Sequence, residues 1–218
     1  TTPVSFSIDG NTPEVVIRLS DKPEKGKISV LKRGEMFSSV EVSEDRYVPV
    51  YSEKGLKGAE FEVSAAEDIY TADGTLRIKA GETADRIISG EDGTAVSKEL
   101  YPGKYLLREI SAPDGFVLDT EVKELTVTAG IKKIEVKNER KKQEYAIQKN
   151  LETDQKFGIG FNGEIFNIRF GLFSKTELTA LDGSIIPAGG LIEVATPDED
   201  GFISFTADMP YNAECYIK

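Results

Sequence analysis

Histidine is absent from the 218 residues of this chain, and cysteine occurs only once, at Cys215. Without histidine the chain cannot form a Ser-His-Asp triad, a Cys-His pair or a histidine-ligated zinc or iron site. A single cysteine closes no disulfide within the chain and supplies no paired thiols for a metal or a redox reaction. These absences exclude much of hydrolytic and redox enzymology, and we expect neither a cofactor nor a metal.

Positive charge is scarce as well. The chain has 27 Lys and Arg residues against 38 Asp and Glu residues, which gives a formal net charge of −11 at pH 7. Proteins that bind nucleic acids or anionic lipids neutralise phosphates with clusters of basic side chains. The only basic run, Arg140–Lys142, is too short to form such a cluster. We therefore expect no nucleic-acid partner.

Long apolar runs are also missing, and none approaches the ~20 residues that a membrane-spanning helix needs. The chain instead contains short runs of alternating apolar residues, and no segment keeps a helical period over four turns. Asp-Gly pairs, which favour tight turns, occur at residues 9–10, 73–74, 92–93, 114–115, 182–183 and 200–201. This pattern predicts an all-β protein built of immunoglobulin-like β-sandwich modules, with no membrane insertion within these residues.

Two parts of the chain repeat one another at fixed spacings. Residues 26–32 and 143–149 each place apolar residues at period two before a lysine. Phe61 and Phe170 each precede an Asp-Gly turn by the same number of residues. Repetition of this kind predicts modules in tandem.

The ends of the modules repeat too, because Asp21 precedes Lys32 by as many residues as Asn138 precedes Lys149. The repeat predicts the terminal strands of a preceding module (1–21), one complete β-sandwich (22–138) and the start of a further, truncated module (139–218). The chain would then be an excised segment of a longer protein. Short, charged linkers predict that the modules follow one another as a semi-rigid string.

The stretch between Lys32 and Gly58 is long for a connection between neighbouring strands. We expect residues 33–57 to form an inserted hairpin. Two roles are open for it: it covers one edge of a sheet, or it contacts a neighbouring module or a ligand.

Three predicted strands end in a polar residue on the face that should be buried. Side chains at i, i+2 and i+4 share one face of a strand. On that basis the inward series are Ile28, Val30 and Lys32; Tyr105, Leu107 and Glu109; and Ile134, Val136 and Asn138. Three buried polar groups are costly unless they satisfy one another.

Each of the three polar residues also has an ordinary interpretation. Lys32 could extend to solvent, Glu109 could lie on the opposite face of its strand, and Asn138 could cap a turn. The repeat argues against three separate explanations, because the lysine recurs at Lys149 and a side-chain carboxyl recurs at Asp21.

Four segments together resemble the Cna B-type, or SpaA-like, prealbumin-like domains found in pilins and adhesin stalks of Gram-positive bacteria. The segment that carries Glu109 is the most specific, because an Ala-Pro-x-Gly-aromatic turn at 112–116 follows it. The four segments are 26–32, 58–61, 101–116 and 136–138.

The resemblance implies a self-generated isopeptide bond. In it, Lys32 is the nucleophile, Asn138 is the acceptor, and Glu109 polarises the Asn138 carbonyl and shuttles a proton to the departing ammonia. It likewise implies that Lys149 (nucleophile) and Asp21 (acceptor) belong to incomplete neighbouring modules. No cofactor takes part, and the reaction happens once per molecule, so the chain is not expected to be an enzyme.

The function implied is a structural stalk or pilin-like segment of an extracellular, cell-wall-anchored surface protein, whose partners are neighbouring modules of the same chain. Two alternatives remain open. One is an adhesive module that binds a host surface or matrix protein, and the other is an accessory domain of an extracellular hydrolase.

Overall fold

The structure, a computed structural model, describes residues 24–158, 160 and 163–218. The predicted acceptor Asp21 and the predicted segment 1–21 lie outside the described residues. The all-β prediction is confirmed, since a short 3-10 helix at Glu164–Asn167 is the only helix in the described part of the chain. No helix among the described residues is long and apolar enough to cross a membrane.

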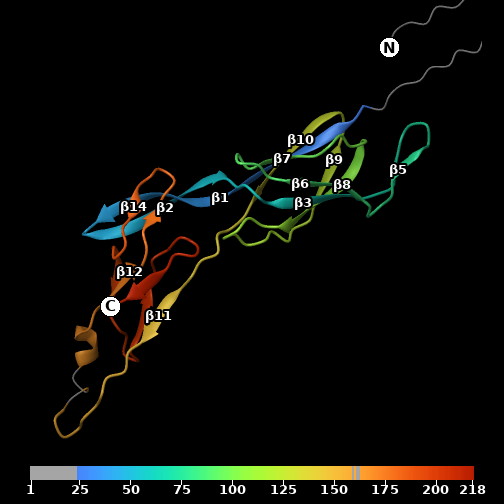
Figure 1. Ribbon diagram of the computed structural model, residues 1–218. Helices are drawn as coiled ribbons and strands as arrows, with labels where there is room; N and C mark the ends of the chain where they lie inside the picture. The colour runs from blue at the N-terminus through green and yellow to red at the C-terminus, as the bar shows by residue number, and fades with distance from the viewer. Residues whose placement is uncertain (1–23, 159, 161–162) are drawn as a thin grey trace, which may run out of the picture.

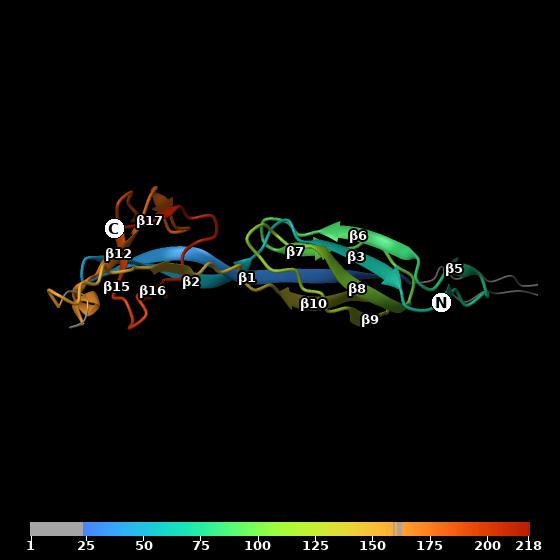
Figure 2. The same ribbon diagram turned by 90° about the horizontal axis from the view of Figure 1, so that it is seen from below.

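Two sheets and a small hairpin make up the N-terminal part, which we call the first unit (24–32 and 56–138). Its strands are β1 (Gly26–Ser43), β3 (Glu60–Ala65), β4 (Ile69–Tyr70), β5 (Leu76–Ile78), β6 (Thr83–Ile88), β7 (Thr94–Val96), β8 (Gly103–Ser111), β9 (Lys123–Val127) and β10 (Gly130–Lys137). One sheet has the order β6-β3-β8-β9, and in the other β1 lies between β10 and β7. The two sheets face each other in Figures 1 and 2.

The core of the first unit lies between these sheets and follows from the alternation in the sequence. Ile28 and Val30 on β1 are completely buried, and so is Tyr105 on β8. Their neighbours in the chain are more exposed, as expected for strands with one buried face. The inward series predicted from the sequence therefore face a single core.

β1 continues well past the first unit and turns back as β2 (Arg46–Gly55). The two strands form an antiparallel ladder, with one irregularity between Phe37 and Ser39. The turn consists of Glu44 and Asp45, both with positive φ angles of 49° and 61°. Two positive φ angles match the twist of the flanking strands in a two-residue hairpin turn. We call residues 33–55 the hairpin.

The C-terminal part, which we call the second unit (143–218), contains shorter strands and a separate core. Its strands are β11 (Tyr145–Gln148), β12 (Phe170–Ser174), β13 (Leu178–Thr179), β14 (Ile185–Ile186), β15 (Leu191–Ala195), β16 (Phe202–Phe205) and β17 (Cys215–Ile217). They pair as β11-β16, β15-β12-β17 and β13-β14. Figure 1 shows the second unit against the hairpin, at the end of the molecule away from β5.

The register of the second unit repeats that of the first. β12 pairs with β17 antiparallel, with Leu172 opposite Ile217, much as Val63 on β3 lies opposite Leu107 on β8. The repeat found in the sequence therefore has a counterpart in strand pairing. The exact module boundaries predicted above stay a prediction.

Candidate functional site

The structure brings Lys32, Glu109 and Asn138 together inside the first unit. They come from three places far apart in the sequence: β1, β8 and the residue that follows β10. Their exposed fractions are 0%, 4% and 6%. Lys32 and Glu109 are charged types that are rarely buried to this degree unless they are paired.

Strand pairing places Lys32 beside Asn138. β1 and β10 run parallel, and Lys32 pairs with Val136. Asn138 lies two residues further along, and its backbone N–H donates to the Arg33 carbonyl over 3.0 Å. Glu109 enters from the opposite sheet, where it pairs with Phe61 of β3.

The three side chains satisfy one another. Lys32 Nζ lies 2.8 Å from Glu109 Oε1 and also donates a hydrogen bond to Asn138 Oδ1. Asn138 Nδ2 donates to the same Glu109 oxygen over 3.1 Å. Buried polar groups that pair in this way avoid the cost of unsatisfied donors and acceptors.

Burial changes the acid–base chemistry of the lysine. Desolvation lowers the pKa of the Lys32 amine from its ordinary 10.5, although its hydrogen bond to Glu109 opposes the change. Nζ also lies 5.6 Å from the centre of the Phe61 ring. Burial among apolar groups therefore favours the neutral form of the amine, which is its nucleophilic form.

A residue that sequence reasoning missed orients Glu109. The backbone N–H of Asp119 donates to Glu109 Oε2 over 2.7 Å. The other oxygen, Oε1, is thereby left to contact both the lysine amine and the asparagine amide nitrogen. A backbone donor in a loop leaves no signal in the sequence, so this contact emerges only from the fold.

The contact of Glu109 differs from the one that the resemblance implies, in which Glu109 polarises the Asn138 carbonyl. Glu109 Oε1 lies at the amide nitrogen of Asn138, whereas the amide oxygen faces Lys32. The amide nitrogen is the group that would leave as ammonia. The arrangement therefore has the geometry that proton transfer from amine to leaving group needs.

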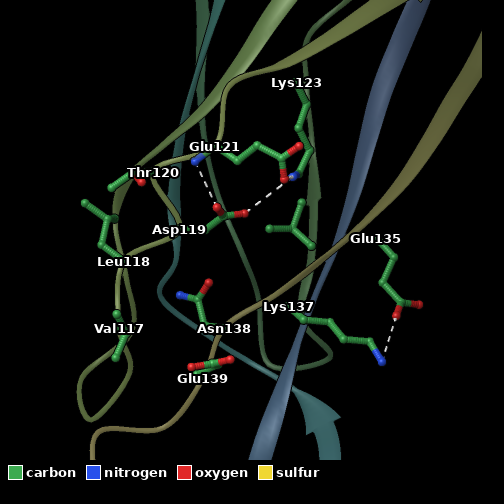
Figure 3. Close-up of a pocket in the computed structure, with 11 residues that line it drawn as sticks. Val117, Leu118, Asp119, Thr120, Glu121, Lys123, Glu135, Lys137, Asn138 and Glu139 are labelled. Atoms are coloured by element: carbon green, nitrogen blue, oxygen red, sulfur yellow. Dashed lines mark hydrogen bonds and ion pairs between the residues drawn. The ribbon is translucent and has the colours of Figure 1, made fainter.

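A cavity of about 470 Å³ reaches Asn138 from the surface. Segment 117–121, Lys123 and the end of β10 line it. Figure 3 shows Asp119 at its wall, bound to the backbone N–H of Glu121 and paired with Lys123. The cavity thus connects Asn138 with the surface of the first unit.

Lys149 occupies in the second unit the place that Lys32 occupies in the first. The N–H of Lys32 donates to the Gly93 carbonyl, and that of Lys149 donates to the Gly201 carbonyl, both over 2.8 Å. Lys149 is half-buried and forms no ion pair with any residue that the structure describes. Asp21, which corresponds to Asn138 in the repeat, lies outside the described residues.

Two further observations concern metal and thiol chemistry. No group of three or more His, Cys, Asp or Glu side chains in the described ranges could hold a metal. Cys215 is a free cysteine of intermediate burial. Burial raises the pKa of its thiol, which disfavours the reactive thiolate.

A family model described as the SpaA prealbumin-like fold domain matches residues 49–142. The matched segment contains Glu109 and Asn138. It begins within β2, so Lys32 precedes it, separated from it by most of the hairpin.

Three individual proteins are similar to this chain. The trypsin-resistant surface T6 protein of Streptococcus pyogenes serotype M6 is 28% identical over 161 residues, which are 73% of this chain and 27% of that protein. The solved Bacillus anthracis TIE protein has 22% identity and a TM-score of 0.51, covering 89% of this chain and 31% of its own. GBS52, the minor pilin of Streptococcus agalactiae, has 17% identity and a TM-score of 0.37, covering 61% of this chain and 49% of its own.

The chain therefore spans only 27% and 31% of the first two of these proteins. The likeness to the TIE protein shows that the two share a fold.

Proposed function

We propose, from the match of residues 49–142 to the SpaA prealbumin-like fold domain, that the chain is a load-bearing stalk segment of a bacterial cell-surface protein. In this proposal Lys32 and Asn138 join through an isopeptide bond, and Glu109 moves the proton. The observation that carries the proposal is the buried contact of these three side chains.

The proposed isopeptide reaction needs only the amine, amide and carboxyl groups that the site contains. With the proton on Glu109, the neutral Lys32 amine attacks Cγ of Asn138, and a C–N bond forms. Glu109 gives its proton to the amide nitrogen, which leaves as ammonia, and takes one from the attacking nitrogen. Glu109 therefore ends in the state in which it began, and one ammonia is released for each bond.

Proximity removes a large part of the activation barrier of this reaction. Holding two reacting groups in a productive geometry is worth ~7–11 kcal/mol of the barrier for a well-oriented pair. Here the strand pairing of β1 with β10 and of β3 with β8 holds amine, amide and carboxyl in contact. The fold itself is thus the catalyst of a reaction that occurs once.

The bond would protect the first unit against extension. β1 is its first strand and β10 its last, and they are parallel neighbours, so the chain enters and leaves at opposite ends. Tension on the chain would pass from Lys32 directly to Asn138, which are 106 residues apart. On the chain-entropy model, a link that closes ~100 residues also contributes ~4.7 kcal/mol to stability.

The setting follows from the proposal. A covalent clamp without paired cysteines suits an extracellular protein under load, and the partners would be adjoining parts of the same surface protein. The adhesive alternative has one observation in its favour: Val42 and Val48, near the tip of the hairpin, are 65% and 42% exposed. A host surface or matrix protein could bind there.

Intact mass spectrometry of the folded 218-residue chain tests the proposal. We expect a mass below that of the sequence by one ammonia, and a branched tryptic peptide that joins Lys32 to Asn138. Lys32→Ala is the matched control and should have the full mass of its own sequence. A folded wild-type sample with the full sequence mass would refute the bond.

A further inference from the structure

The hairpin contributes side chains to the core of the second unit. Phe37 and Val40 of β1 and Tyr47 of β2 pack against the buried cluster that contains Leu172 and Ile186. The hairpin thus does not end in solvent after leaving the first unit. It shares a hydrophobic core with a part of the chain more than 100 residues away, which the closeness of β2, β12 and β14 in Figure 1 illustrates.

Hydrogen bonds hold the same contact in register. The backbone N–H groups of Leu181 and Asp182 donate to the carbonyls of Phe37 and Ser38 over 3.2 and 3.1 Å. The backbone N–H of Val40 donates to the Ser184 hydroxyl over 2.8 Å. These bonds satisfy donors and acceptors at the irregularity in the β1–β2 ladder, so the two surfaces are complementary in polar groups as well as in apolar ones.

Arg140 fixes the linker (139–142) to the hairpin and to the second unit. Its side chain is 8% exposed, and Nη1 donates to Asp208 Oδ1 over 3.0 Å while Nη2 donates to Oδ2. The guanidinium lies 3.5 Å from the centre of the Tyr51 ring in the hairpin. The Tyr51 hydroxyl donates to the Asp208 backbone carbonyl over 2.9 Å. One arginine thereby connects linker, hairpin and second unit.

The chemistry of this cluster suits a permanent contact. A two-pronged arginine–carboxylate pair with a stacked aromatic ring has a defined geometry. Further ion pairs extend the cluster, from Arg140 to Glu35 over 3.4 Å and from Asp208 to Lys142 over 3.3 Å. The hydrogen bonds from Arg140 lower the pKa of Asp208. Burial raises the pKa of Tyr51. The carboxylate therefore stays charged and the phenol neutral across the physiological pH range.

A second contact holds the linker from its other side. Tyr211 of the second unit packs against Gly115, where an added Cβ would come within 3.1 Å of its ring. Lys141 lies over the same ring at 5.4 Å, and its backbone N–H donates to the Gly115 carbonyl over 2.8 Å. Gly115 has φ +81°, a conformation that glycine adopts without strain. The linker is therefore held at Arg140 and at Lys141, while Glu139, Lys141 and Lys142 remain exposed.

We propose that the hairpin is a strut that prevents the first and second units from bending relative to each other. Its interaction surface binds the second unit of the same chain, and Arg140 is the residue that holds the linker to both. The hairpin begins directly after Lys32, and the linker begins directly after Asn138. Two connections thus leave the first unit at one point and meet the second unit at separate places. Two connections resist rotation about the linker, which a single one would permit.

How tension passes the hairpin rests on the proposed isopeptide bond, whereas the rigidity that the hairpin gives to the two units does not. With Lys32 joined to Asn138, tension would bypass residues 33–137, and the hairpin would carry none of the pull. It would remain folded under load and would continue to hold the orientation of the second unit.

The test compares the full chain with Arg140→Gln and Asp208→Asn. Trypsin cleavage after Lys141 and Lys142 reports opening of the linker, and small-angle X-ray scattering reports the spread of orientations between the units. We expect cleavage to become about tenfold faster in both variants, because a charge-assisted pair is lost. The scattering curve should show a broader distribution of distances.

Arg86→Gln is the matched control, because Arg86 pairs with Glu62 on the exposed face of the first unit. It should leave both readouts unchanged. Wild-type cleavage rates and scattering in both Arg140→Gln and Asp208→Asn would overturn the strut. Intact mass is measured on the same samples: a protected linker in a chain without the ammonia loss supports the strut while contradicting the proposed bond.

Discussion

Lys32 Nζ and Glu109 Oε1 lie 2.8 Å apart in the interior of the first unit, where both side chains are buried. A lysine and a glutamate so placed contribute little net stability as an ion pair, because desolvation offsets most of their attraction. In the proposed reaction the pair has a chemical role, since Glu109 would carry the proton that Lys32 must lose before its amine attacks Asn138. The first prediction follows from this pair.

Glu109→Ala should fold but remain unlinked, because amine and amide persist while the proton carrier is gone. Its intact mass should equal its sequence mass. Its free energy of unfolding should fall by ~4–5 kcal/mol, mostly from loss of the cross-link. Glu124→Ala, on the exposed face of the neighbouring strand β9, is the control and should remain linked. Wild-type ammonia loss in Glu109→Ala would show that the catalytic assignment is wrong.

The pH dependence of an unlinked variant reports the state of the buried lysine. In Asn138→Ala, burial still lowers the pKa of Lys32, whose ordinary value is 10.5. Between the lowered value and 10.5 the unfolded state binds more protons than the folded state, so stability should rise with pH in that window. Urea unfolding from pH 7 to 10 measures the rise.

The matched control for that pH series is the double variant Lys32→Met with Asn138→Ala. Other groups titrate equally in both proteins, including Tyr105, whose pKa burial raises to about 12. The difference between the two series therefore isolates Lys32. Parallel curves would mean that the amine has an ordinary pKa in the folded protein.

The Asp119 backbone N–H should determine how fast the bond forms. Asp119→Pro removes the donor to Glu109 Oε2, and we expect bond formation during refolding to slow about tenfold, the effect of losing one hydrogen bond. Asp119→Ala keeps the N–H and removes only the carboxylate, so it should stay close to the wild-type rate. The measurement is the time course of ammonia loss by mass. Equal rates in the two variants would assign no role to the N–H.

Gly93 should be required beside Lys32. A Cβ at this position would lie 2.3 Å from the Lys32 carbonyl oxygen, and the residue has φ +81°. Gly93→Ala should therefore displace β1 at the site, destabilise the fold and slow the cross-link. Gly74→Ala has a similar φ of +78° but nothing within 4 Å of the added Cβ. It should cost only the backbone strain of ~1–2 kcal/mol, as thermal unfolding of the two variants would show.

Part of the site was predictable because strand periodicity is a local property. Side chains at period two share a face whatever the rest of the chain does, so Lys32, Glu109 and Asn138 could be placed on inward faces from their neighbours alone. Since three buried polar groups must satisfy one another, their meeting followed from energetics. The all-β class followed in the same way from alternation and Asp-Gly turns.

The partner of the hairpin could not be predicted from local sequence patterns. The sequence indicated a hairpin at 33–57 but could not choose between covering a sheet edge and contacting a neighbouring module. The structure places Phe37, Val40 and Tyr47 against the second unit. Alternation along a strand indicates that a face is covered, and it does not indicate which distant segment covers it.

The basic run at 140–142 makes the same point about charge. By composition it was too short to bind a polyanion, and no further role could be assigned to it from the sequence. In the fold, Arg140 meets Asp208 and Tyr51, each far from it along the chain. Periodicity within each strand was therefore determined by the sequence itself. Pairing between segments depended on tertiary packing, because a contact between distant residues exists only once the chain has brought them together.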